Sequence, residues 1–232
     1  MRHVCRLVAL LALVPAGSPA HAQQPAAASG DVYHVHFTKA APGKGAALGD
    51  FLRAPTPPPA TPGHVIVLRH QQGDDWDYCV IEHLGPKATV DPAGTPPNPG
   101  TDLRAWHTDT FVSGPPWAEF AKNMGVESTG ASSSVYSVAI WRALPDHRDQ
   151  LEKALQQIDA GSKVQVGRVM LRHLEGGPWQ FLQIERYNSW QDFATDMAAS
   201  ASASGRGPDG WSQVREHSSY HHDTVADRLP AK

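Results

Sequence analysis

The hydrophobic and polar positions of this chain form a pattern that occurs twice. Each occurrence opens with a short stretch rich in β-branched and aromatic residues, at residues 32–37 and at residues 135–141. Such a composition favours a β-strand. Each stretch therefore predicts the first strand of a structural unit.

A helix is predicted after each of these strands. Residues 146–158 place Leu151, Leu155 and Ile158 on one face and charged residues elsewhere, which is a helical period. Residues 44–53 repeat this arrangement more weakly. We therefore expect a helix at this point of both units.

Two strands joined by a tight turn follow in both occurrences. The predicted strand pairs are 64–70 with 76–84, and 164–173 with 179–187. The glycine and polar residues between the strands of each pair are typical of a hairpin turn. The pattern thus predicts two hairpins at equivalent places.

Beyond the hairpins the two occurrences differ. Residues 189–197 predict a helix with Ser189 as its N-cap, whereas residues 85–100 are rich in proline and cannot form a continuous helix. Both occurrences then reach a His-x-Asp-Thr motif, at residues 107–110 and 221–224, and a last strand can follow it.

The repetition extends to individual residues. The sequence VYHV at residues 32–35 returns 103 positions later as VYSV. The same offset relates a second set of matching positions: Arg69-His70 to Arg172-His173, Trp76 to Trp179, and Ile81-Glu82 to Ile184-Glu185. One copy is therefore a control for the other, because residues that both keep are needed by each unit, and residues present once can be particular to one half.

The element order predicts the fold. Strand, helix, strand, strand, helix and a last strand form a ferredoxin-like unit, whose sheet has one bare face. Two such units in one chain can bury these faces against each other. We therefore expect an α+β protein with two tandem ferredoxin-like units, residues 31–130 and 131–232, whose antiparallel sheets pack face to face as an intrachain pseudo-dimeric α+β barrel.

This order and duplication resemble the dimeric α+β-barrel superfamily. Its members include antibiotic-biosynthesis monooxygenases, ethyl-tert-butyl-ether-degradation-like proteins, stress-responsive barrel proteins and haem-handling enzymes. The resemblance covers nearly all of the chain after the leader described next. It implies a small, largely apolar ligand inside the barrel and cofactor-independent oxygenation or isomerisation.

The first 22 residues have the pattern of a secretory signal peptide. Arg2 and Arg6 precede an apolar run at residues 7–14, and Ala20-His21-Ala22 gives an A-x-A cleavage site before Gln23. The apolar run is too short to span a bilayer, and no later segment is apolar enough to do so. We expect an exported protein, periplasmic or secreted, with a disordered linker at residues 23–30.

The cysteines predict no reactive thiol, and the charge distribution argues against a nucleic-acid partner. Cys5 lies in the predicted leader, so the exported chain keeps only Cys79, whose place in a predicted strand favours a small buried hydrophobe. The formal net charge of -3 comes with no long run of one sign and with scattered basic residues, so nucleic acid is an unsuitable partner. The chain can be a monomer or a homodimer.

The shared His-x-Asp-Thr motif is the first candidate for chemistry. Imidazole beside carboxylate, as in His107 with Asp109 and in His221 with Asp223, can orient a general base or a metal ligand. The alternative is structural: Asp-Thr ends a helix and bonds local backbone, while the histidine caps the last carbonyls. The structural interpretation is favoured because both halves keep the motif.

Arg-His at the end of the second strand is the next candidate. We expect Arg69 and His70 to approach Glu82 across the hairpin, and Arg172 and His173 to approach Glu185. Such pairs can bind a ligand or fix the register of the hairpin. Packing is favoured over ligand stacking for the tryptophans that begin the third strands, Trp76 and Trp179.

Two histidines occur in one copy only. His34 and His36 point the same way by the period of a strand, and their counterparts are Ser137 and Ala139. If that face lines the space between the sheets, the first half contributes two imidazoles to a pocket. A metal would need a third ligand from another histidine, for which His64, His70 and His107 are available.

Three functions stay open. The first is an exported small-molecule-binding protein or enzyme, with histidines as acid, base or ligand. The second is haem or transition-metal binding through His34, His36, His70 or His107, although no strong motif requires any cofactor. The third is a non-catalytic interaction or assembly module. A pocket between the sheets lined by His34 and His36 favours the first, and a sealed, filled interior favours the third.

Overall fold

The computed structural model describes residues 30–54, 62–86, 100–126, 133–157, 162–203 and 210–230. The predicted signal peptide and nearly all of the predicted linker lie outside these residues. So do the boundary predicted between the two units and most of the proline-rich stretch.

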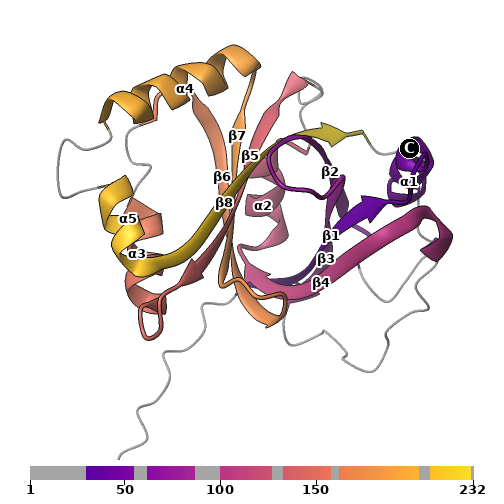
Figure 1. Cartoon of the computed structure of the whole chain (residues 1–232), viewed down its shortest axis with the longest axis horizontal. Helices are drawn as coiled ribbons and strands as arrows, with labels where there is room; N and C mark the ends of the chain where they lie inside the picture. The colour runs from indigo at the N-terminus through magenta and orange to yellow at the C-terminus, as the bar shows by residue number, and fades with distance from the viewer. Residues whose placement is uncertain are drawn as a thin grey trace, which may run out of the picture.

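The strands of the described chain close into one antiparallel barrel (Figure 1). They are β1 Asp31–Ala40, β2 Val65–Gln72, β3 Tyr78–Pro86, β4 Arg104–Gly114, β5 Val135–Ala143, β6 Gln165–Gly176, β7 Phe181–Tyr187 and β8 Ser218–Leu229. Their order around the barrel is β1-β3-β2-β8-β5-β7-β6-β4.

The strand order contains the same arrangement twice. The first half runs β4-β1-β3-β2 and the second runs β8-β5-β7-β6, so each half is a ferredoxin-like sheet. The halves join where β2 pairs with β8 and where β4 pairs with β6. The predicted α+β fold with two tandem units in one barrel is confirmed, and the edges of the sheets are joined as well.

Two buried threonines hold these joints together. The hydroxyl of Thr110 on β4 accepts a hydrogen bond from the backbone N–H of Gly177 at 3.0 Å, and Thr224 on β8 accepts one from Asp74 at 3.3 Å. Each threonine therefore binds the hairpin turn of the opposite half. Since Thr110 and Thr224 belong to the His-x-Asp-Thr motif, barrel closure explains why both copies keep its threonine.

The motif lies in the middle of strands. β4 pairs with β1 through this stretch, and β8 pairs with β5. The interpretation that Asp-Thr ends a helix is therefore wrong, because sheet pairing already satisfies the backbone groups around the motif.

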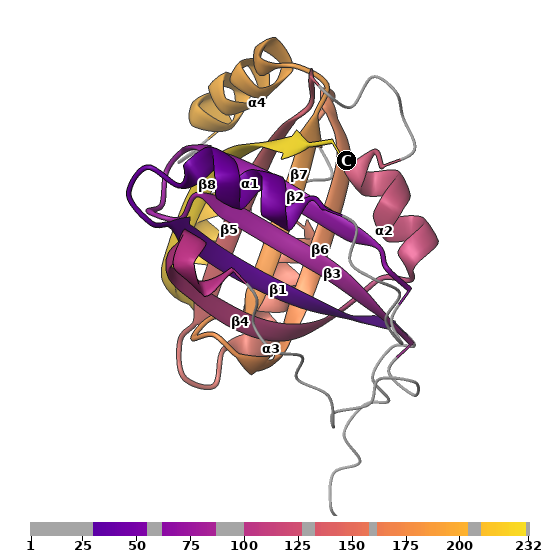
Figure 2. The ribbon, with the colours of Figure 1, turned by 90° about the vertical axis from the view of Figure 1, so that its right-hand side faces the viewer.

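Helices cover the outer faces of the sheets. They are α1 Gly45–Leu52, α2 Trp117–Met124, α3 Arg148–Gln157, α4 Trp190–Ala203 and α5 Trp211–His217, with a 3-10 turn at Thr101–Leu103. Figures 1 and 2 show α1 outside the first half, α3 and α5 outside the second, and α2 across one end of the strands.

The predictions of α1, α3 and α4 are confirmed. The hydroxyl of Ser189 accepts the N–H of Asp192 at 3.1 Å, as expected of an N-cap.

Helices α2 and α5 were not predicted from the sequence. For α2 the signal is present: Trp117, Phe120 and Met124 recur at helical spacing, and Gly125 ends the helix with φ 64°. Phe120 and Met124 are buried in the main core, so α2 closes one end of the barrel.

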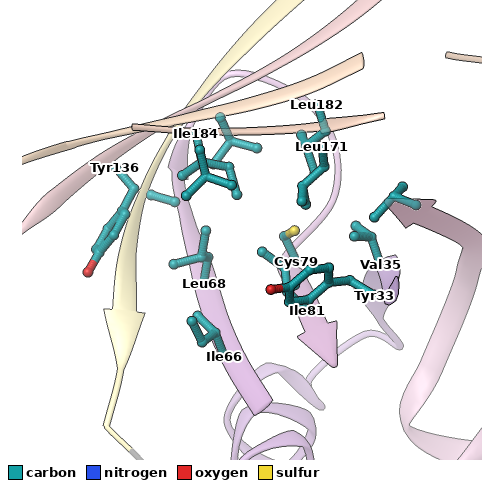
Figure 3. Close-up of a cluster of buried hydrophobic side chains, with 14 of the residues drawn as sticks. Tyr33, Val35, Ile66, Leu68, Cys79, Ile81, Tyr136, Leu171, Leu182 and Ile184 are labelled. Atoms are coloured by element: carbon teal, nitrogen blue, oxygen red, sulfur yellow. The ribbon is translucent and has the colours of Figure 1, made fainter. Parts of the chain in front are cut away.

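Apolar side chains from both halves fill the barrel interior (Figure 3). The first half contributes Tyr33, Val35, Ile66, Leu68, Cys79 and Ile81, and the second contributes Tyr136, Val138, Leu171, Leu182 and Ile184. The prediction that Cys79 is a buried small hydrophobe is confirmed: it is fully buried, and burial raises the pKa of its thiol.

In the described part of the chain, no helix has the length and apolar character that crossing a membrane requires.

Candidate functional site

His34 and His36 lie on the outer face of the first half's sheet. Tyr33, Val35 and Phe37 of β1 point into the barrel core, and successive residues of a strand point to opposite faces. The face that carries the two histidines therefore does not line the space between the sheets, as the pocket hypothesis required. The candidate site is on the opposite side of the sheet.

Two carboxylates hold the ring of His34. Its Nδ1 lies 2.9 Å from Oε2 of Glu82 on β3, and its Nε2 lies 3.0 Å from Oδ1 of Asp109 on β4. An ionised carboxylate only accepts hydrogen bonds, so both ring nitrogens donate and His34 is an imidazolium. The strand register brings the three residues together, because His34 pairs with Glu82 and the neighbouring His36 pairs with Asp109.

The pKa values of this group follow from the contacts. Burial lowers the pKa of His34, but the hydrogen bonds and charges of Glu82 and Asp109 outweigh it, and the net effect raises the pKa. The hydrogen bond from His34 lowers the pKa of Glu82 against the opposing effect of burial. Both shifts favour the charged forms of His34 and Glu82, in agreement with the hydrogen bonds between them.

His36 is the neutral member of the site. Its ring stacks on His34 with centroids 5.2 Å apart and planes at 7°. Burial, with the charge of His34, lowers the pKa of His36 to about 4. The side chain is 8 % exposed, and its Nε2 is enclosed without a hydrogen-bond partner in the described residues. Nε2 of His70 and of His173 is enclosed in the same way, so His36 is distinguished by its stacking on the imidazolium of His34.

Three further side chains surround the two histidines. Phe111 is 40 % exposed, and its ring also stacks on His34, with centroids 5.1 Å apart. The Nε2 of His107 lies 3.2 Å from Oδ2 of Asp109. The charge of Arg104 helps to lower the pKa values of His36 and Glu82. Phe111 and Arg104 were not predicted from the sequence, although the alternation of side chains along β4 places Phe111 on the same face as Asp109.

The described residues of the second half form no equivalent site. His221 and Asp223 repeat the imidazole–carboxylate contact at 2.7 Å, but Asp223 pairs with Ala139 where Asp109 pairs with His36. Glu185 contacts the hydroxyl of Tyr187 where Glu82 holds His34. The acid–base cluster is therefore particular to the first half.

Arg69 and Arg172 have other partners than predicted. Arg69 forms a bidentate pair with Asp227 on β8, at 3.0 and 2.6 Å, and Arg172 pairs with Glu152 on α3. The register explains the difference from prediction, because Arg69 lies opposite Tyr78 near the turn, whereas Glu82 lies at the far end of the hairpin. Arg172 similarly lies opposite Phe181, and Glu185 lies opposite Arg168.

His70 and His173 have matching surroundings in the two halves. The rings of His70 and Trp76 are steeply inclined, at 65° with centroids 5.6 Å apart, and those of His173 and Trp179 lie at 70° with centroids 6.0 Å apart. Both tryptophans are buried in the main core. These four residues are thus not brought to His34 and His36.

The candidate cluster offers a metal few free donors. Both nitrogens of His34 already bond carboxylates, so coordination at His34 would break one of these bonds. Within the described ranges, no group of three or more histidine, cysteine, aspartate and glutamate side chains has the geometry of a metal site.

Two shallow clefts lie elsewhere on the surface. One of about 370 Å³ lies beside Arg69, His70 and Tyr78, and one of about 270 Å³ lies beside Arg69, Gln71 and Trp190. Neither is lined by His34 or His36. These two clefts therefore do not mark the candidate site, which is defined by its side-chain chemistry.

Replacing Glu82 with glutamine is expected to lower the pKa of His34. The change should also destabilise the protein by about 1 kcal/mol, since it removes a charge-assisted hydrogen bond that is partly screened by solvent. The raised pKa of His34 stabilises the fold at low pH and ceases to do so as pH rises through it, and the lowered pKa of Glu82 has the opposite sense. The loss should thus be greatest between their ordinary values, 6.5 and 4.5.

NMR titration of the His34 ring and urea unfolding at several pH values measure both effects. Asp223→Asn is the matched control, because Asp223 contacts His221 in the half without the cluster. An unchanged pKa of His34 in Glu82→Gln would show that the carboxylate does not hold the imidazolium.

Comparison with known proteins finds similarity in structure. No protein-family model matches the chain, and no curated protein matches it. A protein described as anthrone oxidase-like is similar over 87 % of this chain and 92 % of its own, with a TM-score of 0.58 and 12 % identity. A "putative monooxygenase" of Fusobacterium nucleatum is similar over 88 % of this chain and 94 % of its own, with a TM-score of 0.57 and 8 % identity. The resemblance to dimeric α+β barrels is confirmed for the fold.

Proposed function

We propose that this protein binds a small, largely apolar molecule against the outer face of its first sheet and removes a proton from it. The reaction class is cofactor-independent oxygenation or isomerisation. One observation carries the proposal: His36 is a neutral, enclosed imidazole without a hydrogen-bond partner in the described residues, and it stacks on a protonated His34.

The cluster has the parts that proton abstraction needs. With its pKa lowered to about 4, His36 keeps a lone pair at neutral pH, and it can accept a proton from a carbon acid once the side chains that enclose Nε2 move aside. His34, Glu82 and Asp109 keep the charges around it fixed, so the site is organised before substrate binds. Phe111 offers an apolar face beside them.

The two reaction types share this first step. Proton transfer to His36 leaves a carbanion delocalised over a neighbouring carbonyl. Return of the proton to another carbon completes an isomerisation. Reaction of the carbanion with dissolved dioxygen, followed by loss of water, converts a methylene group to a ketone. Glu82 and Asp109 face the protonated His36 and offset its new charge.

Export is part of the proposal. The N-terminal pattern ending at Ala22 supports a cleaved leader and a periplasmic or secreted protein. N-terminal sequencing of the protein expressed with its leader tests this, since a mature chain that still begins at Met1 contradicts export by this leader.

Oxygen uptake with anthrone tests the activity. The structural neighbour described as anthrone oxidase-like suggests this probe. We expect the wild-type protein to consume oxygen and form anthraquinone faster than buffer alone, and to do so without added metal or cofactor. A rate equal to that of buffer contradicts the proposal for this substrate class.

The filled barrel interior favours a second candidate, a non-catalytic interaction or assembly module. Buried apolar side chains occupy the space where a ligand inside the barrel would have to lie. This candidate predicts no oxygen uptake with anthrone, so the same measurement separates the two.

A further inference from the structure

A second hydrogen-bonded histidine group lies at one end of the barrel. The Nε2 of His83 on β3 lies 2.8 Å from Oδ2 of Asp31 on β1, and the Nδ1 of His83 lies 3.0 Å from Nδ1 of His64. The same Oδ2 accepts the backbone N–H of Trp117 at 2.9 Å. Three elements and the residue before β2 thus converge on one chain of hydrogen bonds.

The rings are aligned for a straight hydrogen bond. The planes of His64 and His83 differ by 8°, and their centroids lie 5.3 Å apart, which equals the nitrogen separation plus about two ring radii. The indole of Trp117 lies flat against both, 4.2 Å from His64 at 9° and 5.1 Å from His83 at 16°. Trp117 therefore shields the bond between the imidazoles from water on one face.

The carboxylate fixes where the protons are. Asp31 accepts the Trp117 N–H, and as an ionised group it can only accept from His83, so Nε2 of His83 carries a proton. When His83 is neutral, its Nδ1 accepts the Nδ1–H of His64. The Nε2 of His64 is left with its lone pair, in a side chain that is partly exposed.

The pKa of His64 is consistent with a neutral ring. Burial lowers it, and a positive charge on His83 would lower it as well, so both effects favour the neutral form of His64. Asp31 and His83 are largely buried, with side chains 14 % and 6 % exposed. The group therefore has a buried carboxylate at one end and a reactive nitrogen at the other.

The group belongs to the first half alone. By the 103-residue offset, the counterparts of Asp31, His64 and His83 are Ser134, Gly167 and Arg186. The repeated unit folds in the second half without any of the three. Their assembly is thus not required by the ferredoxin-like sheet.

We propose that His64 is a nucleophile for acyl transfer from small activated esters, with His83 and Asp31 as the relay that takes up its proton. Nε2 of His64 attacks the ester carbonyl carbon, the C–N bond forms, and the C–O bond to the leaving group breaks. The Nδ1 proton moves to His83, whose new positive charge lies beside Asp31. The acyl-imidazole is thereby neutral, and water hydrolyses it to the carboxylic acid while the proton returns.

The chain contains a matched control pair. Nδ1 of His147 also lies 3.0 Å from Nδ1 of His217, but their planes are tilted by 47°. Among the described residues, no carboxylate bonds either ring. His147 thus contacts a second imidazole, as His64 does, but that imidazole has no carboxylate partner in the described residues.

Hydrolysis of p-nitrophenyl acetate by the full chain tests the proposal. We expect His64→Ala and Asp31→Asn each to slow release of p-nitrophenolate by at least about tenfold, and His147→Ala to leave it unchanged. Mass spectrometry of the acid-quenched wild type should find the acetyl group on His64. Circular dichroism of Asp31→Asn shows whether the variant is folded.

Two results would overturn the proposal. One is an unchanged rate in folded His64→Ala. The other is acetylation of wild-type His64 no greater than that of His147, which needs no variant to fold. Because the reaction uses neither His34 nor His36, its failure leaves the oxygen-uptake proposal standing, and failure of oxygen uptake leaves this one standing.

Discussion

Replacing His36 with alanine is expected to reduce anthrone-dependent oxygen uptake by about a hundredfold or more, because general-base catalysis contributes effects of this size. Stability should change by less than about 1 kcal/mol, since the loss of packing is offset by removal of an orphaned buried nitrogen. The second half supports this expectation, because Ala139 occupies the equivalent position and is as buried as His36.

Oxygen-electrode rates and urea unfolding measure the two quantities on one preparation. His70→Ala is the control for loss of an imidazole from the same half, because His70 lies against Trp76 and not in the candidate cluster. Uptake that survives in folded His36→Ala contradicts its role as base. A variant that unfolds identifies His36 as a core residue instead.

The sequence was sufficient to predict the barrel. Strand composition and the 103-residue offset are local or internal signals, and both depend on residues that the repeated unit needs. The threonine of the His-x-Asp-Thr motif is an example: its hydroxyl bonds the opposite hairpin in each half, so duplication retained it.

The orientation of β1 was also available in the sequence. Tyr33 and Val35 recur as Tyr136 and Val138, and all four face the core, whereas His34 and His36 do not recur. Applying the rule that shared residues serve the repeated unit to each face of the strand would have placed the histidines outside. The positions at which the two halves differ did identify β1 as the strand that carries the candidate site.

Contacts between distant elements were beyond prediction. The pairing of Arg69 with Asp227 depends on how β2 meets β8 across the joint, and the relay of Asp31, His83 and His64 depends on the position of α2. Neither distance is set by local periodicity. Such contacts follow from barrel closure, which one sequence does not specify in register.

Replacing Gly176 with alanine is expected to destabilise the protein by more than about 3 kcal/mol, since it combines backbone strain with a steric clash. Gly176 has φ 112°, and a Cβ there would lie 2.2 Å from the carbonyl oxygen of Asp109. Urea unfolding measures the loss. Gly43→Ala isolates the strain, because Gly43 has φ 75° and nothing lies within 4 Å of its added Cβ. Equal losses in the two variants would exclude the clash.

Gly73, the counterpart of Gly176, offers a variant that should lose stability without disturbing the candidate site. Gly73→Ala would place a Cβ 2.5 Å from the carbonyl oxygen of Asp223, at φ 128°, so a comparable loss of stability is expected. Only Gly176→Ala displaces the backbone of Asp109, whose carboxylate holds His34. The pKa of His34 should therefore fall in Gly176→Ala and stay unchanged in Gly73→Ala, as measured by NMR on the folded fraction. An equal shift in both variants would mean that the cluster responds to general loosening of the barrel and not to the position of Asp109.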